Sequence, residues 1–199
     1  MQPVEWRRPM ILRIDHVSIA VRDYERARRF FQQLMGAIAG AGATEEPMKY
    51  QWRIFSLGDL SRLELIHPTG PESFLGGFLK EREGGVHHIT LQTADIHRAK
   101  ALLAEHAIPY FGFKEYGEFW KELFIHPRDA FGVLIQIAEF NADDFLDESV
   151  KLAGNRKWEV LPTDRGCRLT IVHPGGGKAV VEFSREEAAS LAAELKRLV

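Results

Sequence analysis

Four polar residues of types that bind metal ions or move protons recur at matched places in two similar segments of the chain. His16 lies in the segment Ile14-Asp-His-Val-Ser-Ile-Ala-Val21, and His88 lies 72 residues later in Val86-His-His-Ile-Thr-Leu-Gln-Thr93. The same offset relates Glu64 to Gln136. Two imidazoles, a carboxylate and an amide oxygen in one apolar cleft would be costly to bury unless they were paired or bound a cation. The repeat therefore predicts a site for one divalent ion, whose identity cannot be chosen from the ligand types alone.

The two segments open two copies of one folding pattern. Each copy starts with the alternation of a strand and then changes to the spacing of a helix, as in Ala27, Phe30, Phe31 and Leu34. Asp23 and Asp95 are the expected helix N-caps. Further strand-like runs follow at Gln51 to Leu57 and Arg62 to Ile66 in the first copy, and at Lys121 to Ile125 and Val133 to Ala138 in the second.

The fold class that follows is α+β, with two tandem βαβββ modules at residues 12–70 and 84–140 that form a cleft. Alternation along each strand tells which side chains line that cleft. Val17 and Ile19 must face a helix, so His16 faces inward, and the same rule turns His88 inward. Leu63 and Leu65 flank an inward Glu64, as Ile135 and Ile137 flank Gln136. One cluster of pseudo-twofold symmetry is expected.

Residues 141–199 form an extension with a different pattern. Strands are predicted at Trp158 to Leu161, Arg168 to Val172 and Ala179 to Phe183, followed by an amphipathic helix that begins with the capping box Ser184-Arg-Glu-Glu187. Gly175-Gly-Gly-Lys178 lacks the spacing of a phosphate-binding loop and is predicted to be a hairpin turn. We expect the extension to pack on the modules, to extend a dimer interface or to cover the cleft.

Composition limits the class of partner. The chain has 199 residues with 26 basic and 28 acidic side chains and a net charge of −2, which argues against nucleic acid and an anionic membrane as partners. No window is apolar enough to span a bilayer, and residues 1–10 lack the apolar core of a secretory signal, so a cytoplasmic location is expected. A small-molecule substrate is expected, and a homodimer is left open.

The remaining candidates for chemistry are weaker. Cys167 is the single cysteine, which excludes a disulfide within the chain and a cysteine-rich zinc site, and it is predicted to be a small apolar strand residue. His87 should point away from the cleft as a surface or helix-packing residue. His67 and His126, each followed by proline, are predicted loop residues.

With its Asp-His-Val-Ser-Ile-Ala-Val opening, the repeat resembles the vicinal oxygen chelate, or glyoxalase, superfamily of paired βαβββ modules over residues 12 to 140. Within that superfamily the chain is similar to methylmalonyl-CoA epimerases. The similarity lies in Leu63-Glu-Leu-Ile-His-Pro68, Phe74-Leu-Gly-Gly-Phe-Leu-Lys80, Gly84-Gly-Val-His-His-Ile89, His126-Pro and Gly132-Val-Leu-Ile-Gln136.

The resemblance implies that His16, Glu64, His88 and Gln136 hold one divalent ion, which could be Zn, Co, Mn, Ni, Mg or Fe. In epimerase-like members the position of Gln136 is usually a glutamate that also moves a proton. Here the amide and the acid have exchanged places, so Glu64 is expected to take the catalytic acid role from the other side of the ion.

The implied chemistry is removal of a proton next to a carbonyl that a Lewis acid polarises. Coordination of an ion opposes the raised pKa that a base at neutral pH needs, so a second carboxylate would help Glu64. Epimerase-like relatives carry such an acid in the region of Glu45 and Glu46, and we favour Glu46. A solvated turn at these residues is the competing interpretation.

Three functions remain open at this stage. The first is a metal-dependent lyase or isomerase, most sharply an acyl-CoA epimerase. The second is an Fe(II) ring-cleaving dioxygenase, because His16, His88 and Glu64 could form a two-histidine, one-carboxylate set. The third is a binding protein of the antibiotic-sequestering kind, without catalysis or metal. Function has to be decided from the site rather than from the fold.

Overall fold

The computed structural model describes residues 10–173 and 177–198, so the predicted turn at Gly175-Gly-Gly-Lys178 lies partly outside the described residues. The two predicted modules are present. The first consists of β1 (Ile11–Val21), α1 (Tyr24–Arg29), β2 (Ile38–Glu45), β3 (Tyr50–Ser56) and β4 (Arg62–Pro68). The second consists of β5 (Gly84–Thr93), α3 (Ile96–Glu105), β6 (Phe111–Tyr116), β7 (Trp120–Ile125) and β8 (Ile135–Glu139).

Each module starts its helix at the predicted cap. The Asp23 carboxylate accepts a hydrogen bond from the backbone N–H of Arg26, and Asp95 does the same for Arg98. Helix α1 continues as a π-helical turn, η1 (Phe30–Leu34), and the short helix α2 (Leu75–Phe78) lies in the connection between the modules.

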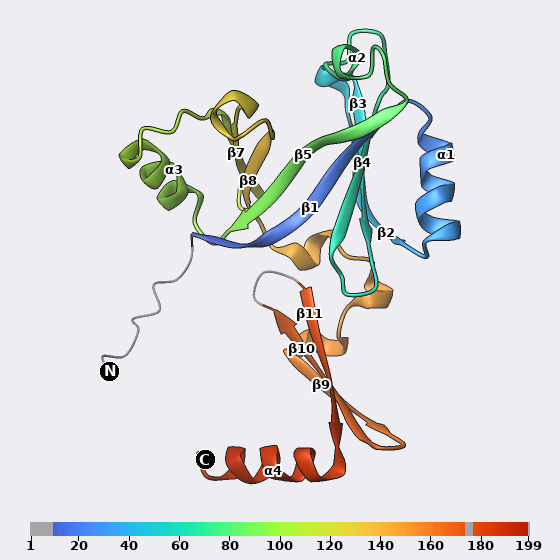
Figure 1. Ribbon diagram of the computed structural model, residues 1–199, viewed down its shortest axis with the longest axis vertical. Helices are drawn as coiled ribbons and strands as arrows, with labels where there is room; N and C mark the ends of the chain where they lie inside the picture. The colour runs from blue at the N-terminus through green and yellow to red at the C-terminus, as the bar shows by residue number, and fades with distance from the viewer. Residues whose placement is uncertain (1–9, 174–176, 199) are drawn as a thin grey trace.

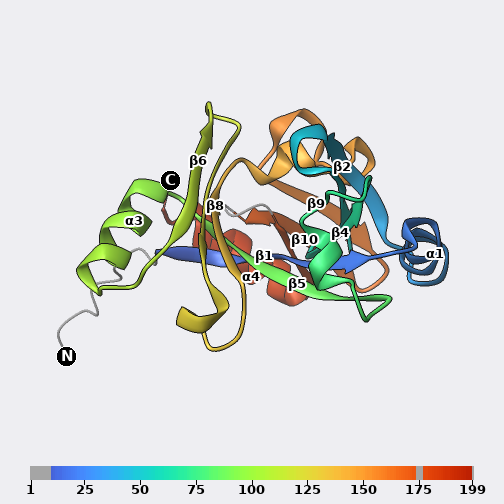
Figure 2. The same ribbon diagram turned by 90° about the horizontal axis from the view of Figure 1, so that it is seen from above.

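One curled sheet contains the strands of both modules, in the order β2-β3-β4-β1-β5-β8-β7-β6 (Figures 1 and 2). The modules join where β1 pairs antiparallel with β5. Within each module the opening and closing strands pair in parallel, β1 with β4 and β5 with β8. The α+β fold of two βαβββ modules is therefore confirmed. The boundaries at 12–70, 84–140 and 141–199 stay a prediction.

Helices cover the outer face of the sheet and leave the inner face to the site. Leu65 packs in a cluster with side chains of α1, whereas Ile137 packs against Ile96 and Leu103 of α3. Because alternate residues of a strand face opposite ways, Glu64 and Gln136 point inward. The orientation predicted for the closing strands is confirmed.

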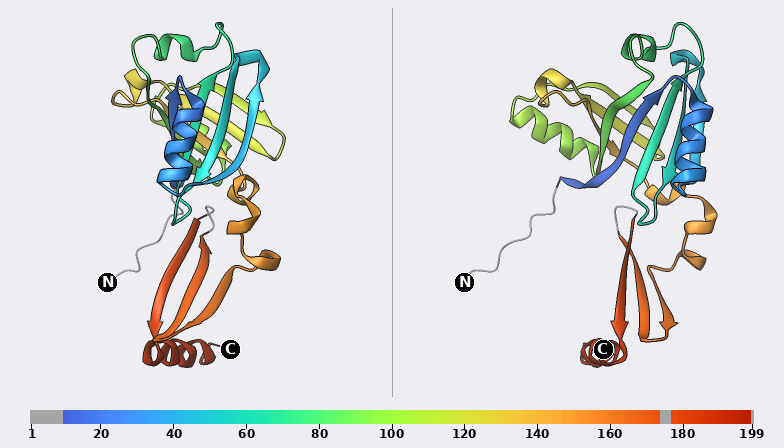
Figure 3. Two further views of the ribbon diagram at one scale, coloured as in Figure 1. Left: turned by 90° about the vertical axis from the view of Figure 1, so that its right-hand side faces the viewer. Right: turned by 45° about the vertical axis from the view of Figure 1, so that its right-hand side comes forward.

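The extension forms a second sheet beyond the modules (Figure 3). Its strands β9 (Trp158–Thr163), β10 (Gly166–His173) and β11 (Gly177–Ser184) form an antiparallel sheet, and α4 (Arg185–Lys196) follows with the predicted capping box between Ser184 and Glu187. Three single turns, η4 (Ala142–Phe145), η5 (Glu148–Val150) and η6 (Ala153–Asn155), connect it to β8. Cys167 is half-buried in β10, as predicted. Among the described residues, no helix is long and apolar enough to cross a bilayer.

Candidate functional site

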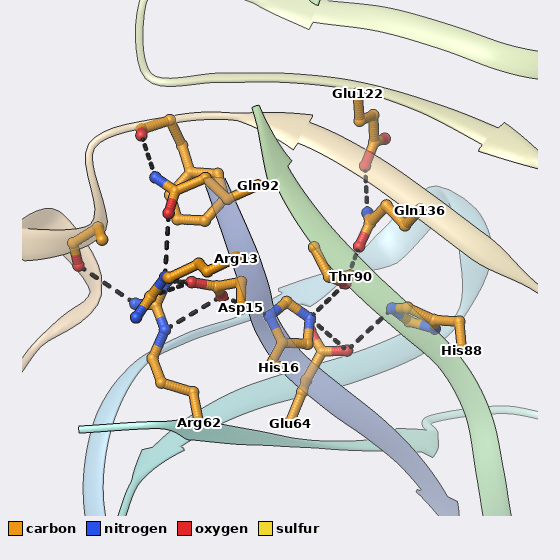
Figure 4. A network of polar contacts seen from close by, with 12 residues as sticks. Arg13, Asp15, His16, Arg62, Glu64, His88, Thr90, Gln92, Glu122 and Gln136 are labelled. Atoms are coloured by element: carbon orange, nitrogen blue, oxygen red, sulfur yellow. Dashed lines mark hydrogen bonds and ion pairs between the residues drawn. The ribbon is translucent and has the colours of Figure 1, made fainter. Parts of the chain in front are cut away.

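Three of the predicted ligands converge on the inner face where the modules meet. One ligand atom each from His16, Glu64 and His88 can be chosen so that all lie within 4.8 Å of one another, and all three residues are buried (Figure 4). Glu64 Oε2 lies 3.8 Å from His16 Nε2 and 3.6 Å from His88 Nε2. Both separations are too long for hydrogen bonds, and within residues 10–173 and 177–198 this oxygen has no hydrogen-bond partner. A buried carboxylate oxygen without a partner between two imidazoles is the environment that a cation satisfies.

Gln136 joins this group through the hydroxyl of Thr90. Thr90 Oγ1 donates to Gln136 Oε1 at 2.5 Å and lies 2.8 Å from His16 Nε2. The structure therefore brings all four predicted ligand residues together, two from each module. Thr90 is a fifth polar side chain on the same inner face, where alternation along β5 placed it.

His16 is supported by a buried ion pair. Its Nδ1 lies 2.7 Å from Asp15 Oδ2, and the Arg62 guanidinium lies 2.5 and 3.1 Å from the two carboxylate oxygens of Asp15. Burial alone would raise the pKa of Asp15, but the hydrogen bond with His16 and the charge of Arg62 outweigh it and hold that pKa well below its usual value. An ionised Asp15 fixes the His16 ring with its Nε2 toward the cluster.

His88 is supported by its neighbour in the chain. His88 Nδ1 lies 2.9 Å from His87 Nδ1, and the His87 ring packs against Phe74 and Phe78. Burial, with the nearby His16 and His87, lowers the pKa of His88 well below its usual value, so its imidazole is neutral at pH 7 and able to coordinate. The helix-packing role predicted for His87 is confirmed, and its hydrogen bond to His88 is an addition.

The two histidines predicted to be loop residues, His67 and His126, lie outside this cluster. His126 precedes a single 3-10 turn, as predicted for a loop residue. The loop prediction for His67 was wrong: it lies inside β4, half-buried and stacked on Tyr24. The following proline did not end the strand, because β4 pairs with β3 as far as Pro68.

A carboxylate that the sequence analysis did not single out borders Gln136. Glu122 Oε2 accepts hydrogen bonds from Gln136 Nε2 at 2.6 Å and from Trp120 Nε1 at 2.9 Å. Burial raises the pKa of Glu122, although these two hydrogen bonds oppose the rise. Since only the nitrogen of the Gln136 amide can donate to Glu122, its oxygen faces the cluster. Alternation along the predicted strand Lys121 to Ile125 was the available signal, since Leu123 and Ile125 face the helix.

The structure separates the two acids between which the sequence analysis chose. Glu45, the last residue of β2, is half-buried and lines the same cavity as His16 and Glu64. The side chain of Glu46 is 74% exposed and forms an ion pair with Lys49 at 3.2 Å. The geometry therefore favours Glu45 over Glu46, because the chain turns outward directly after β2.

The cluster opens on a cavity of about 200 Å³ whose other walls are aromatic. Glu45, Glu64 and Glu122 form its acidic side. The pKa of the Tyr50 hydroxyl is raised by burial and by these three charges. The aromatic lining comes from both modules and from the segment after β8, and its members are Tyr50, Trp52, Tyr116, Phe119, Trp120 and Phe145. A polar reaction centre beside an apolar wall is typical of small-molecule sites.

Comparison with known proteins agrees with this geometry. The family described as the Glyoxalase/Bleomycin resistance protein/Dioxygenase superfamily matches residues 15–122. A protein of Cereibacter sphaeroides named ethylmalonyl-CoA/methylmalonyl-CoA epimerase is 37% identical over 134 residues, which is 65% of this chain and 99% of the relative. The mitochondrial methylmalonyl-CoA epimerase of Bos taurus is 33% identical over 130 residues, 64% of this chain and 74% of the relative.

A solved structure adds a ligand to the comparison. A variant of Streptomyces coelicolor methylmalonyl-CoA epimerase in complex with 2-nitronate-propionyl-CoA is 26% identical, with a TM-score of 0.58 over 66% of this chain and 99% of that one.

Proposed function

The chain belongs to the glyoxalase/bleomycin resistance protein/dioxygenase superfamily, and on this premise we propose that it is a metal-dependent epimerase of a 2-substituted acyl-CoA thioester. The observation that carries the proposal is the Glu64 oxygen between the Nε2 atoms of His16 and His88, which has no hydrogen bond among the described residues. The epimerases to which the chain is similar supply the substrate class.

The residues of the cluster fit a divalent ion. His16, Glu64, His88 and Gln136 would hold it with two nitrogen and two oxygen donors, a set that suits borderline first-row ions and leaves positions open. Such an ion would supply a Lewis acid that polarises the thioester carbonyl and stabilises the negative charge that develops on its oxygen. The identity of the ion among Zn, Co, Mn, Ni, Mg and Fe is not part of the proposal.

Epimerisation needs a proton to leave one face of a carbon and to return on the other. Glu45 and Glu122 lie on opposite arms of the curled sheet, border one cavity and do not belong to the proposed ligand set. We assign them to the two faces. Glu122 has the raised pKa that a proton-transfer group requires near neutral pH. The catalytic role of Glu64, beyond that of ligand, stays a prediction.

The two alternatives receive less support. A dioxygenase needs vacant positions beside two histidines and one carboxylate, and Gln136 is held with its amide oxygen toward that set. A binding protein without a metal would leave the Glu64 oxygen buried and without a partner. A homodimer and a cytoplasmic location are further proposals about the assembly and its place in the cell.

The test is exchange of the 2-proton of methylmalonyl-CoA with solvent deuterium, followed by NMR or mass spectrometry. We expect deuterium to enter when the protein has been loaded with a divalent ion and to stop entering when EDTA is added. Glu45→Gln should abolish interconversion of the two epimers and confine exchange to the epimer whose proton faces Glu122, and Glu46→Gln, the matched exposed neighbour, should do neither. Exchange that proceeds equally with EDTA would contradict metal dependence.

A further inference from the structure

The segment that follows the second module returns to the cavity and closes one end of it. Phe145, in the turn η4, is only 4% exposed and lines the cavity together with His16, Glu64 and Gln136. Its ring centroid lies 5.1 Å from that of Phe119, 5.4 Å from that of Trp120 and 6.3 Å from that of Trp52. Since Trp52 is on β3 and Trp120 is on β7, Phe145 bridges the two arms of the sheet.

This segment is held against the modules. Arg62 Nη1 donates to the carbonyl oxygen of Ala142 at 3.2 Å, and the Arg62 guanidinium lies 5.6 Å from the centre of the Phe145 ring. On the other side the Phe145 carbonyl lies so close to β2 that a Cβ atom on Gly40 would be 2.2 Å from its oxygen. Only glycine permits this approach, so the position of η4 against β2 requires a glycine at residue 40.

The end wall follows the part of the chain that carries the motifs of the epimerase resemblance. The last of those motifs ends at Gln136, nine residues before Phe145. The Cereibacter epimerase is matched over 99% of its length and leaves about a third of this chain unmatched. Phe145 is where the segment after β8 lines the cavity.

The wall determines what kind of group can lie against it. The cavity lining nearest Phe145 is aromatic at Trp52, Phe119 and Trp120. Arg62, which also lines the cavity, is paired with Asp15, and the remaining carboxylates of the lining are Glu45, Glu64 and Glu122. An apolar substituent gains by lying against aromatic rings, and a charged one would lose its hydration there.

We propose that Phe145 is a specificity-determining residue that limits the size of the apolar substituent on the reacting carbon of the thioester. The inference rests on the proposed function, because it assumes a thioester whose reacting carbon lies beside the cluster. Short alkyl groups such as methyl and ethyl fit in front of the Phe145 ring, and butyl or benzyl groups collide with it.

The experiment compares CoA thioesters of methyl-, ethyl-, butyl- and benzylmalonate with the full-length, metal-loaded protein. For each compound we would measure the dissociation constant by calorimetry and kcat/KM by 2-proton exchange. In Phe145→Ala the butyl-to-methyl ratio of kcat/KM should rise, and that of the dissociation constant should fall, by at least about 10-fold, since one methylene in an apolar pocket is worth about 10–200-fold. Phe145→Leu, a smaller change in packing, should change both ratios less.

Phe140→Leu is the matched control. Phe140 is also buried, at 8% exposure, and stacks on Trp120 at 4.6 Å in the same aromatic cluster, but it does not line the cavity. Phe140→Leu should lower the free energy of unfolding as Phe145→Leu does, and it should leave the butyl-to-methyl ratios unchanged. Circular dichroism would set a temperature at which all variants are folded.

The outcomes separate this inference from the proposed function. Turnover in which Phe145→Ala and Phe145→Leu keep the wild-type ratio would overturn the role of Phe145 alone. A second outcome is that affinity decreases with substituent size in the wild type, that this decrease is smaller in Phe145→Ala, and that no proton exchange occurs. This would support the role of Phe145 and overturn the proposed epimerase function. A wild-type protein that binds none of the thioesters would overturn both.

Discussion

The two half-sites, 72 residues apart in the chain, share their ligands and differ in what supports them. In the first, His16 is backed by the Asp15 carboxylate, which is paired with Arg62. In the second, the position equivalent to Asp15 is His87, which contacts Nδ1 of His88 and packs between aromatic rings. The repeat has thus preserved the two histidines and the positions of all four proposed ligands, whereas the residues behind the histidines have diverged.

The carboxylates show the same divergence. Ile66 and Ala138 are related by the repeat, and they pair with Trp52 on β3 and Glu122 on β7. The first half therefore has its glutamate on the closing strand, at Glu64, beside a tryptophan. The second half has glutamine on the closing strand, at Gln136, and its glutamate on the neighbouring strand. Each half supplies one acid to the inner face at these matched positions, from a different strand.

The largest expected effect is on the charged support of the first half. Asp15→Asn leaves the Arg62 guanidinium buried and without its counter-charge, which should lower the free energy of unfolding by about 3–5 kcal/mol. Urea unfolding in EDTA at pH 7 measures this. Glu25→Gln, which breaks an exposed ion pair with Arg28, should lower the free energy of unfolding far less, because solvent screens that pair. Similar losses in the two variants would show that the Asp15 pair is not a buried charge pair.

Glu64→Gln should affect metal binding and stability in opposite directions. Burial raises the pKa of Glu64 above its ordinary value of 4.5, although His16 and Ser18 oppose the rise. In the metal-free protein the folded state then holds a proton that the unfolded state releases, so the free energy of unfolding falls as pH rises above 4.5 through the folded pKa. Glu64→Gln should remove the contribution of this proton to the decrease of the free energy of unfolding with pH.

The difference between wild type and Glu64→Gln in urea unfolding, measured in EDTA from pH 5 to 8, isolates this contribution. The variant should be the more stable protein at pH 8 without metal and should lose more than the roughly 10–100-fold in metal affinity that a supporting residue costs. A wild-type protein that is more stable than the variant at pH 8 in EDTA would mean that Glu64 has a partner within the protein.

Glu122→Gln tests the acid of the second half. Loss of the carboxylate removes the group that fixes the Gln136 amide, and metal affinity should fall by about 10–100-fold in calorimetry. The double variant Glu122→Gln/Gln136→Glu moves the carboxylate to the closing strand, and we expect it to recover most of the affinity. If the double variant binds no better than the single one, orientation of Gln136 is not the role of Glu122.

The smallest effect is expected at His87. His87→Phe keeps the packing against Phe74 and Phe78 and removes only the contact with His88 Nδ1. Because His88 keeps its ring position, metal affinity should fall by less than about 10-fold. The metal affinity of Asp15→Asn would be measured in the same titration. Equal losses of metal affinity in His87→Phe and Asp15→Asn would mean that the supports of His88 and His16 are equivalent.

Much of the site could be predicted because it depends on local rules. The repeat and the two-residue period of a strand were enough to place His16, Glu64, His88 and Gln136 on one face. The choice between Glu45 and Glu46 depended on the residue at which β2 ends and the chain turns outward. No periodic pattern marks that residue, and a bulge between Ala39 and Gly42 shifts the register of β2.

Phe145 lay beyond sequence reasoning for a different reason. Its place in the cavity depends on where the chain goes after β8, and the charged residues around it indicate only a connection. The contacts with Arg62 and Gly40 that hold η4 join residues far apart in the chain. The rest of the extension was predicted strand by strand, but Thr170 is the only buried residue among the described residues from 158 to 198. The strands and the helix of residues 158–198 therefore bury almost no side chains, and the sequence has no buried apolar pattern that would indicate how they pack on the modules.

The most direct measurement is the metal content and metal affinity of protein purified without chelator and without nickel resin, compared with the His16→Ala/His88→Ala double variant. We predict about one equivalent of a divalent ion per chain in the wild type and none in the double variant, because the ion needs ligands from both halves. Equal metal content in the two proteins, or no metal in the wild type after soaking with several ions, would contradict a single site built from the two modules.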